Sequence, residues 1–93
     1  MTLLLKDAEA ALDYAVDWGA EYLGADTVAQ SDWHVTPVEV GGLSLLASGL
    51  DGKVATATAA GGVPGHLYQL TNHVLLSSGL TDSRSIVLRV EKR

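Results

Sequence analysis

Hydrophobic and polar residues alternate along two segments in the last third of the chain, HLYQLTNHVLL and RSIVLRV. A hydrophobic period of two, rich in β-branched residues, is typical of strands that bury one face. The segment between them, SSGLTD, is short and polar and contains a glycine, so it predicts a hairpin. The residues expected to face the core from these strands are Tyr68, Leu70, Val74, Leu76, Ile86, Leu88 and Val90.

Two shorter strands are predicted upstream, near residues 43–48 and 53–59. The Asp51-Gly52 pair between them is a strong turn signal, because glycine adopts the positive φ that a tight hairpin requires. A second turn is predicted at Gly61-Gly62, and a further strand carries Trp33 and Val35 on one face.

Residues 7–23 fit two periodicities. Apolar residues from Ala8 to Tyr22 form a helical stripe with good helix formers. The same segment also alternates, with Leu12, Tyr14, Val16 and Trp18 on one side. We favour a strand over 11–18, preceded by a short extended or helical arm at 1–10, because everything downstream is β. The six or seven strands that result, spaced by about 8–12 residues, predict one all-β, immunoglobulin- or fibronectin-III-like sandwich over residues 11–93.

The composition excludes several classes of function. The chain has 93 residues and no cysteine, which suits one domain without a disulfide or zinc-thiolate framework. Its leucine run at 3–5 is too short for a signal segment or a membrane span, so synthesis in the cytoplasm is expected. A net charge of −5 without a basic stripe argues against a nucleic-acid partner.

Charge is uneven along the chain. Residues 1–52 carry nine acids and one base, whereas residues 53–93 carry five bases and two acids. The acidic half of one copy could meet the basic end of another. Alternatively, the first and last strands lie side by side within one molecule.

No catalytic, cofactor or metal site is predicted. The chain lacks a Gly-x-Ser-x-Gly elbow, and a hydrolytic or metal-binding enzyme would need more than its three histidines offer. His66 and His73 are seven residues apart, which places them on opposite sides of an unbroken strand. His34 and Asp32 can share a face, but two ligands are not a metal site.

Three polar residues have structural explanations. Asp13 and Asp17 share a face in either periodicity, and an outward acidic face of an amphipathic strand accounts for them. Asn72 lies on the apolar face of its strand, where we expect it to bond to a neighbouring backbone group, since a buried unpaired amide costs about 1–3 kcal/mol.

The segments DW…YLGADTVAQSDW and YQLTNHV…SSGLTDSRSIVLRV resemble a family of small tailed-bacteriophage proteins encoded among head and tail morphogenesis genes. Tyr22 stands where a second tryptophan is expected. The matching positions are Asp17, Trp18, Tyr22, Leu23, Gly24, Asp26, Thr27, Val28, Ser31, Trp33, Tyr68, Leu70, Thr71, Asn72, Val74, Gly79, Thr81, Asp82, Arg84, Ser85, Leu88 and Val90.

The resemblance implies a virion structural protein, made in the host cytoplasm, that acts by assembly and not by catalysis. It would decorate the capsid or complete the head-to-tail neck. Its partners would be the major capsid protein, portal or neck proteins, or tail proteins, within a symmetric homo-oligomer. The alternative is an adhesion module of a tail or fibre that binds the host surface.

Two sets of residues are expected to matter for this function. Trp18, Trp33 and Tyr68 are predicted core anchors, with the Tyr68 hydroxyl available as a corner latch. Leu3, Leu4 and Leu5 form either an assembly arm that adds to a partner's sheet edge or the start of the molecule's own first strand.

Overall fold

The computed structural model describes residues 2–19 and 27–92. All of its regular structure is β, which confirms the predicted class. Tyr22, Leu23, Gly24 and Asp26 of the first family segment lie outside the described residues. The strands are β1 (Thr2–Asp7), β2 (Ala11–Asp17), β3 (Val28–Thr36), β4 (Leu43–Asp51), β5 (Val54–Gly61), β6 (Leu67–Leu76) and β7 (Thr81–Glu91).

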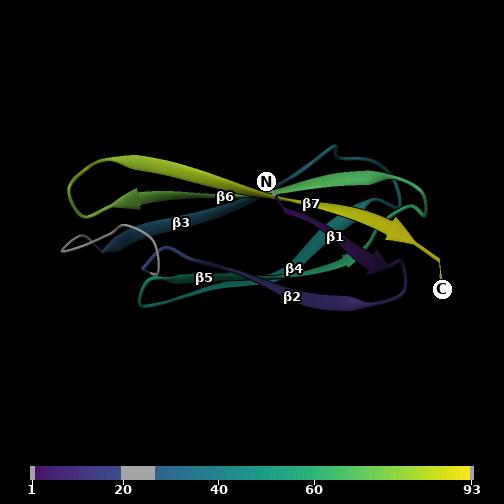
Figure 1. Cartoon of the computed structure of the whole chain (residues 1–93), viewed down its shortest axis with the longest axis horizontal. Coiled ribbons are helices and arrows are strands. Elements are labelled where there is room, and N and C mark those ends of the chain that lie inside the picture. Colours follow the sequence, from purple (N-terminus) through teal and green to yellow (C-terminus); the bar gives the residue numbers. More distant parts are fainter. Residues whose placement is uncertain (1, 20–26, 93) are drawn as a thin grey trace.

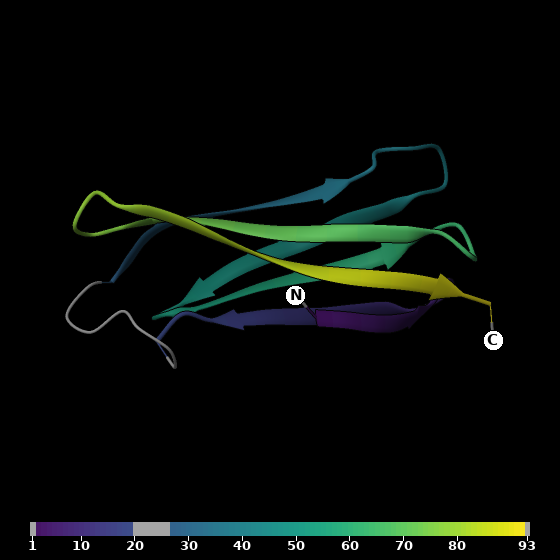
Figure 2. The same ribbon diagram turned by 45° about the horizontal axis from the view of Figure 1, so that its top comes forward.

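The strands form two facing sheets (Figures 1 and 2). One sheet has four strands in the order β1-β7-β6-β3, and the other has three in the order β2-β5-β4. β1 runs parallel to β7, while every other pairing is antiparallel. The molecule is elongated, with extents of 43 × 21 × 19 Å. The predicted β-sandwich is therefore confirmed.

Within the segment that fits two periodicities, residues 11–17 form a strand. β2 pairs with β5 from Ala11 to Asp17, and its inward side chains are Tyr14 and Val16. Trp18 continues this face just beyond the strand, where its backbone N–H donates to the carbonyl of Lys53 over 2.9 Å. The helical alternative is wrong. Both periodicities are present in the sequence, but the backbone of β5 pairs with residues 11–17 and so favours the strand.

The predicted turns are present. Gly52 closes the β4–β5 hairpin with φ of 62°. At the β5–β6 corner, Gly62 has φ of 106°, and a Cβ there would lie 2.6 Å from Cγ2 of Val90. Glycine is needed at Gly62 both for the backbone conformation and for the close approach of β7.

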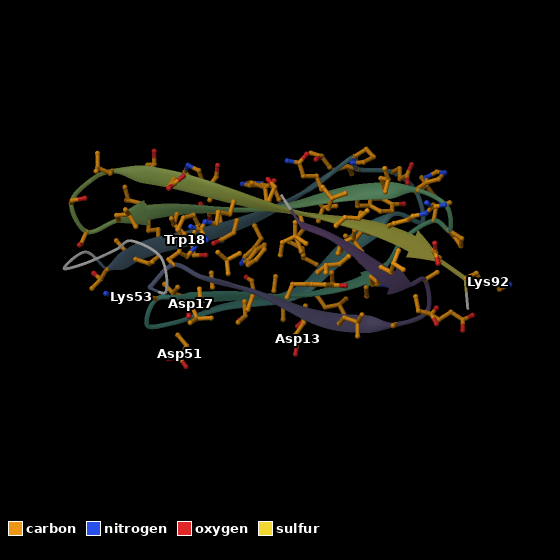
Figure 3. All side chains as sticks on the ribbon, viewed as in Figure 1. Asp13, Asp17, Trp18, Asp51, Lys53 and Lys92 are labelled. Atoms are coloured by element: carbon orange, nitrogen blue, oxygen red, sulfur yellow. The ribbon has the colours of Figure 1, made fainter. Side chains whose placement is uncertain are left out.

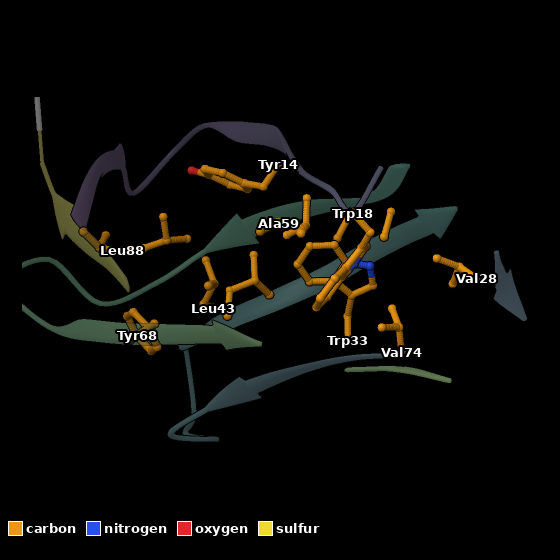
Figure 4. Packing of buried hydrophobic residues seen from close by; sticks show 14 of the residues in the cluster. Tyr14, Trp18, Val28, Trp33, Leu43, Ala59, Tyr68, Val74 and Leu88 are labelled. Carbon is orange, nitrogen blue, oxygen red and sulfur yellow. The ribbon is translucent and has the colours of Figure 1, made fainter. Parts of the chain in front are cut away.

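The core lies between the two sheets (Figure 4). Trp18, Trp33 and Tyr68 are all buried in it, whereas Ile86 packs at its margin and is only partly buried. β5 contributes only small inward side chains, so large rings from other strands fill the space that they leave. The buried hydrophobic residues are Tyr14, Val16, Trp18, Val28, Trp33, Leu43, Ala55, Ala57, Ala59, Tyr68, Leu70, Val74, Leu76, Leu88 and Val90.

Asn72 is buried within this core and fully hydrogen-bonded. Its Nδ2 donates to the Asp32 carbonyl over 3.0 Å, which confirms the expected backbone bond. The same amide nitrogen also donates to Ser31 Oγ over 2.8 Å, and its Oδ1 accepts from Trp18 Nε1. Burial of the Asn72 amide therefore costs little free energy, because each of its hydrogen-bonding atoms has a partner.

Residues 2–7, expected as part of an arm over 1–10, form edge strand β1 of the molecule's own sheet. Their register runs from Thr2 opposite Ile86 to Asp7 opposite Glu91, so the first and last strands do lie side by side. Lys6 is buried there, which the sequence pattern did not predict. Its Nζ donates to the carbonyls of Asp7 and Gly61, both over 2.8 Å, and so links β1 to the three-stranded sheet.

Candidate assembly surface

The outer face of the four-stranded sheet carries exposed leucines from neighbouring strands. Leu3 lies opposite Val87, and Leu5 lies opposite Arg89, which in turn pairs with Leu67 on β6. The side chains of Leu3, Leu5 and Leu67 are 61%, 51% and 56% exposed. We call Leu3, Leu5, Leu67 and Val87 the leucine face. Arg89 lies between Leu5 and Leu67 on the same face. Exposed apolar side chains gathered on one face mark interaction surfaces.

The leucine face continues into a shallow groove beside β3. The groove has a volume of about 340 Å³ and is lined by Thr36, Pro37, Leu67, Tyr68, Gln69 and Val87. Leu4, the middle residue of the predicted arm, points to the opposite side of β1 and is also partly exposed. The three leucines therefore do not act as one unit, because alternate strand residues face opposite ways.

The loop over residues 37–42 projects two valines beside this groove. Val38 and Val40 are 91% and 100% exposed. Between them, Glu39 turns back to accept hydrogen bonds from the Tyr68 hydroxyl and from His66 Nδ1, the latter over 2.9 Å. The loop is thus fixed at its centre while its apolar side chains remain outside.

The Tyr68 hydroxyl joins this network to the β5–β6 corner. It accepts a hydrogen bond from the Val63 backbone N–H over 2.8 Å and donates to Glu39. Hydrogen bonds from Tyr68 and then His66 lower the pKa of Glu39 below its ordinary value. Burial, followed by the bond to Glu39, raises the pKa of Tyr68. Tyr68 is therefore both a core anchor and the corner latch that the sequence analysis considered.

A second groove lies between edge strands β3 and β4. It has a volume of about 530 Å³ and small side chains on the β4 side. Trp33 lines it, and the buried Nε1 of this indole has no hydrogen-bond partner among the residues that the structure describes. The lining residues are Ala29, Gln30, Ser31, Asp32, Trp33, Ser48, Gly49 and Leu50.

The outer face of the three-stranded sheet is acidic. Asp13 and Asp17 of β2 and Asp51 of β4 point away from the sandwich in Figure 3. The Asp13 carboxylate accepts a hydrogen bond from the Thr58 hydroxyl on the adjacent strand. The expectation of an outward acidic face is confirmed.

The histidines are dispersed. His34 and Asp32 share the outer face of the four-stranded sheet, with His73 opposite Asp32 on β6. His66 lies in the corner before β6 and bonds to Glu39. Among residues 2–19 and 27–92, no cluster of three or more metal-ligating side chains is present. The same residues contain no helix with the length and apolar character needed to cross a membrane.

Sequence reasoning missed the buried ammonium of Lys6 and the anchoring role of Glu39. No local signal separates Lys6 from an exposed strand residue, because its hydrogen-bond partner Gly61 is 55 positions away. For Glu39, the flanking valines give a weak signal, since a charged residue between two apolar loop residues can be the one that turns inward.

A comparison with known families agrees with the resemblance noted in the sequence. The profile of the family described as podophage GP4 fiber-tail adaptor protein gp77 matches residues 6–89. No curated protein matches the chain. Because the profile covers most of the sequence, the chain belongs to this podophage family, and it is a bacteriophage virion structural protein.

Proposed function

We propose that this member of the podophage fiber-tail adaptor family joins a fibre to the tail through protein–protein contacts, without a catalytic step. The family match over residues 6–89 carries the proposal. A small sandwich with an exposed apolar face suits such a role, because an adaptor needs a rigid body and a surface that partners can cover. The words fiber-tail adaptor in the family description favour a location in the tail over one on the capsid surface or in the neck.

We also infer that the sandwich is immunoglobulin-like. β2-β5-β4 and β3-β6-β7 have the neighbour relations of strands B-E-D and C-F-G in immunoglobulin domains. Trp33 is buried on β3, as the tryptophan of strand C is. Tyr68 lies near the start of the sixth strand and bonds to the backbone of Val63, five residues upstream, in the manner of a tyrosine corner.

The leucine face is the docking surface in this proposal. Leu3 and Leu5 lie on an edge strand and are already ordered, so binding them involves little loss of conformational entropy. Several copies arranged symmetrically would add modest contacts into a stable attachment. The expected partners are tail and fibre proteins, together with further copies of this chain.

Quantitative proteomics of purified virions tests the location. A tail or neck ring requires about six to twelve copies per particle, whereas capsid decoration requires tens to hundreds. A ring-like copy number, together with loss of the fibre from particles that lack this chain, supports the adaptor. Absence from particles, or a copy number that scales with the capsid, contradicts it.

Substitution of the leucine face tests the surface. L3S/L5S should leave the sandwich folded, because both side chains are exposed, but should abolish incorporation into particles. L46S is the matched control, since Leu46 is similarly exposed on β4, in the other sheet. Full occupancy of the L3S/L5S protein would mean that docking uses another surface, such as the β5–β6 corner at residues 62–66.

A further inference from the structure

We propose that β1 is an exchangeable strand, and that in the assembled form β1 of one copy occupies the β7 edge of a second copy. The inference rests on the proposed function only in requiring that several copies of the chain meet. It combines both interpretations of Leu3–Leu5, since β1 belongs to its own sheet in the free chain and acts as an arm in the assembly.

β1 contributes little to its own domain. It lies at the end of the strand order and pairs only through β7, in the parallel arrangement, which is slightly less stable per residue than the antiparallel one. None of the buried hydrophobic residues of the core lies on β1. Its three leucines all remain partly exposed. Undocking β1 therefore uncovers an edge without dismantling the hydrophobic cluster.

Lys6 determines which strand can bind to the β7 edge that β1 leaves. Its ammonium is buried and donates across to the carbonyl of Gly61 in the other sheet. A slip of β1 by one residue would place Leu5 or the Asp7 carboxylate there, and neither can donate a side-chain hydrogen bond to that carbonyl. A single buried polar residue can fix register in this way at some cost in stability. The β7 edge thus selects a strand with a lysine at this position.

The segment that meets these requirements is β1 itself. In an exchanged pair, the register from Thr2 opposite Ile86 to Asp7 opposite Glu91 forms between copies instead of within one copy. The bond from the Ala8 N–H to the Glu91 carbonyl, 2.9 Å long in the free chain, can also form between copies. The pairing of β1 with β7 is reproduced between copies, which is why exchange of an identical element is a low-cost route to association.

The connector allows the movement. Only residues 8–10 join β1 in one sheet to β2 in the other. Straightening them breaks one backbone bond, from the Ala10 N–H to the Asp7 carbonyl. The continuous strand over residues 2–17 would then be about 50 Å long, enough to reach a neighbour. Short connectors of this kind favour exchange between copies over closure within one copy.

Disulfide trapping tests the exchange, because the chain has no native cysteine. Leu3 and Val87 face each other across β1 and β7, and neither belongs to the core cluster. L3C and V87C chains, differing in mass, are refolded together from urea, concentrated and oxidised. We expect an L3C–V87C heterodimer in a yield about tenfold above that of a Q69C and V87C mixture.

The Q69C control separates exchange from face-to-face contact. Gln69 lies opposite Val87 on the other side of β7, within the β6–β7 hairpin, and shares the outer face. Two leucine faces pressed together would cross-link both mixtures equally. Equal yields, or no heterodimer in the L3C mixture at any concentration, overturn the proposal.

A locked variant gives an independent readout. The L3C/V87C chain, oxidised while dilute, closes β1 onto its own β7. We expect it to remain monomeric by light scattering at concentrations where the reduced protein dimerises, and to dimerise once reduced. Dimerisation of the locked form contradicts the exchange. Such a failure leaves the adaptor role intact, because virion copy number tests that role separately.

Discussion

The indole N–H of Trp18 donates a 2.8 Å hydrogen bond to Oδ1 of Asn72, and both side chains are fully buried. Trp18 follows β2 in the three-stranded sheet, whereas Asn72 lies on β6 in the four-stranded sheet. Asn72 also bonds to Ser31 and to the backbone of Asp32 on β3. One amide therefore fixes the position of a large ring across the sandwich and ties two strands beneath it.

Replacing Asn72 by alanine should lower the free energy of unfolding by about 2–4 kcal/mol, because it leaves the Trp18 N–H and the Asp32 carbonyl without their partner. Urea unfolding measures the change. Trp18→Phe provides the second arm of a double-mutant cycle, for which we expect a coupling of about 1–2 kcal/mol. Additive effects of the two substitutions would show that the bond contributes nothing to stability.

Trp33 should respond differently to two substitutions. Trp33→Ala leaves a cavity between the sheets and should cost about 3–5 kcal/mol, much of a small domain's stability. Trp33→Phe removes an Nε1–H that has no partner, so we expect a cost of only about 1 kcal/mol. The midpoint of thermal unfolding of each Trp33 variant measures its cost. The same measurement on Trp18→Phe, which removes an indole N–H that does have a partner, should give a larger loss than Trp33→Phe. Equal losses in the two phenylalanine variants would contradict it.

Glu39 should make the free energy of unfolding depend on pH in the acid range. Hydrogen bonds from Tyr68 and His66 lower the pKa of Glu39 below its ordinary value of 4.5. Between the pKa of Glu39 in the folded chain and its ordinary value of 4.5, the unfolded chain therefore binds more protons than the folded chain. The stability that Glu39 contributes is fully present above about pH 4.5 and is lost as pH falls through the pKa of Glu39 in the folded chain. The difference in urea midpoint between wild type and E39Q should shrink between about pH 5 and pH 3. A difference that does not change with pH would refute this role.

Gly62 and Gly65 offer a matched test of space against backbone conformation. Both have positive φ, at 106° and 88°. A Cβ at Gly62 would clash with Val90, whereas a Cβ at Gly65 meets nothing within 4 Å. Gly65→Ala should therefore cost about 1 kcal/mol, and Gly62→Ala about 2–3 kcal/mol or more. Chemical unfolding of both variants measures the costs, and equal costs would mean that β7 moves away without penalty.

Local patterning predicted most of the strands because one sheet face is buried. Along β6, the buried positions from Tyr68 to Leu76 follow the alternation that the sequence displays, and Asn72 was identified as the exception that needs partners. The Asp51-Gly52 turn was equally predictable, since its geometry depends on adjacent residues. β4 and β5 end at Asp51 and Gly61, beyond the expected ends at 48 and 59, because ladder pairing between them continues to those residues.

The candidate surface could be predicted only in part. Leu3, Leu4 and Leu5 were singled out as an apolar terminus, but their division between two faces depends on β1 pairing with β7. Leu67 and Val87 join Leu3 and Leu5 only through that register. Residues on three strands form one face, and no spacing along the chain encodes it.

The sequence by itself determined the all-β class, the hairpins and the resemblance to small bacteriophage virion proteins, because period-two alternation, turn chemistry and short motifs are local properties. Tertiary structure decided that residues 11–17 form a strand, because a segment with both periods adopts the one whose backbone partners are present. It also decided that Lys6 is buried and that Glu39 turns inward to Tyr68, 29 positions away. Such contacts depend on how two sheets pack together, and sequence neighbours do not specify that packing.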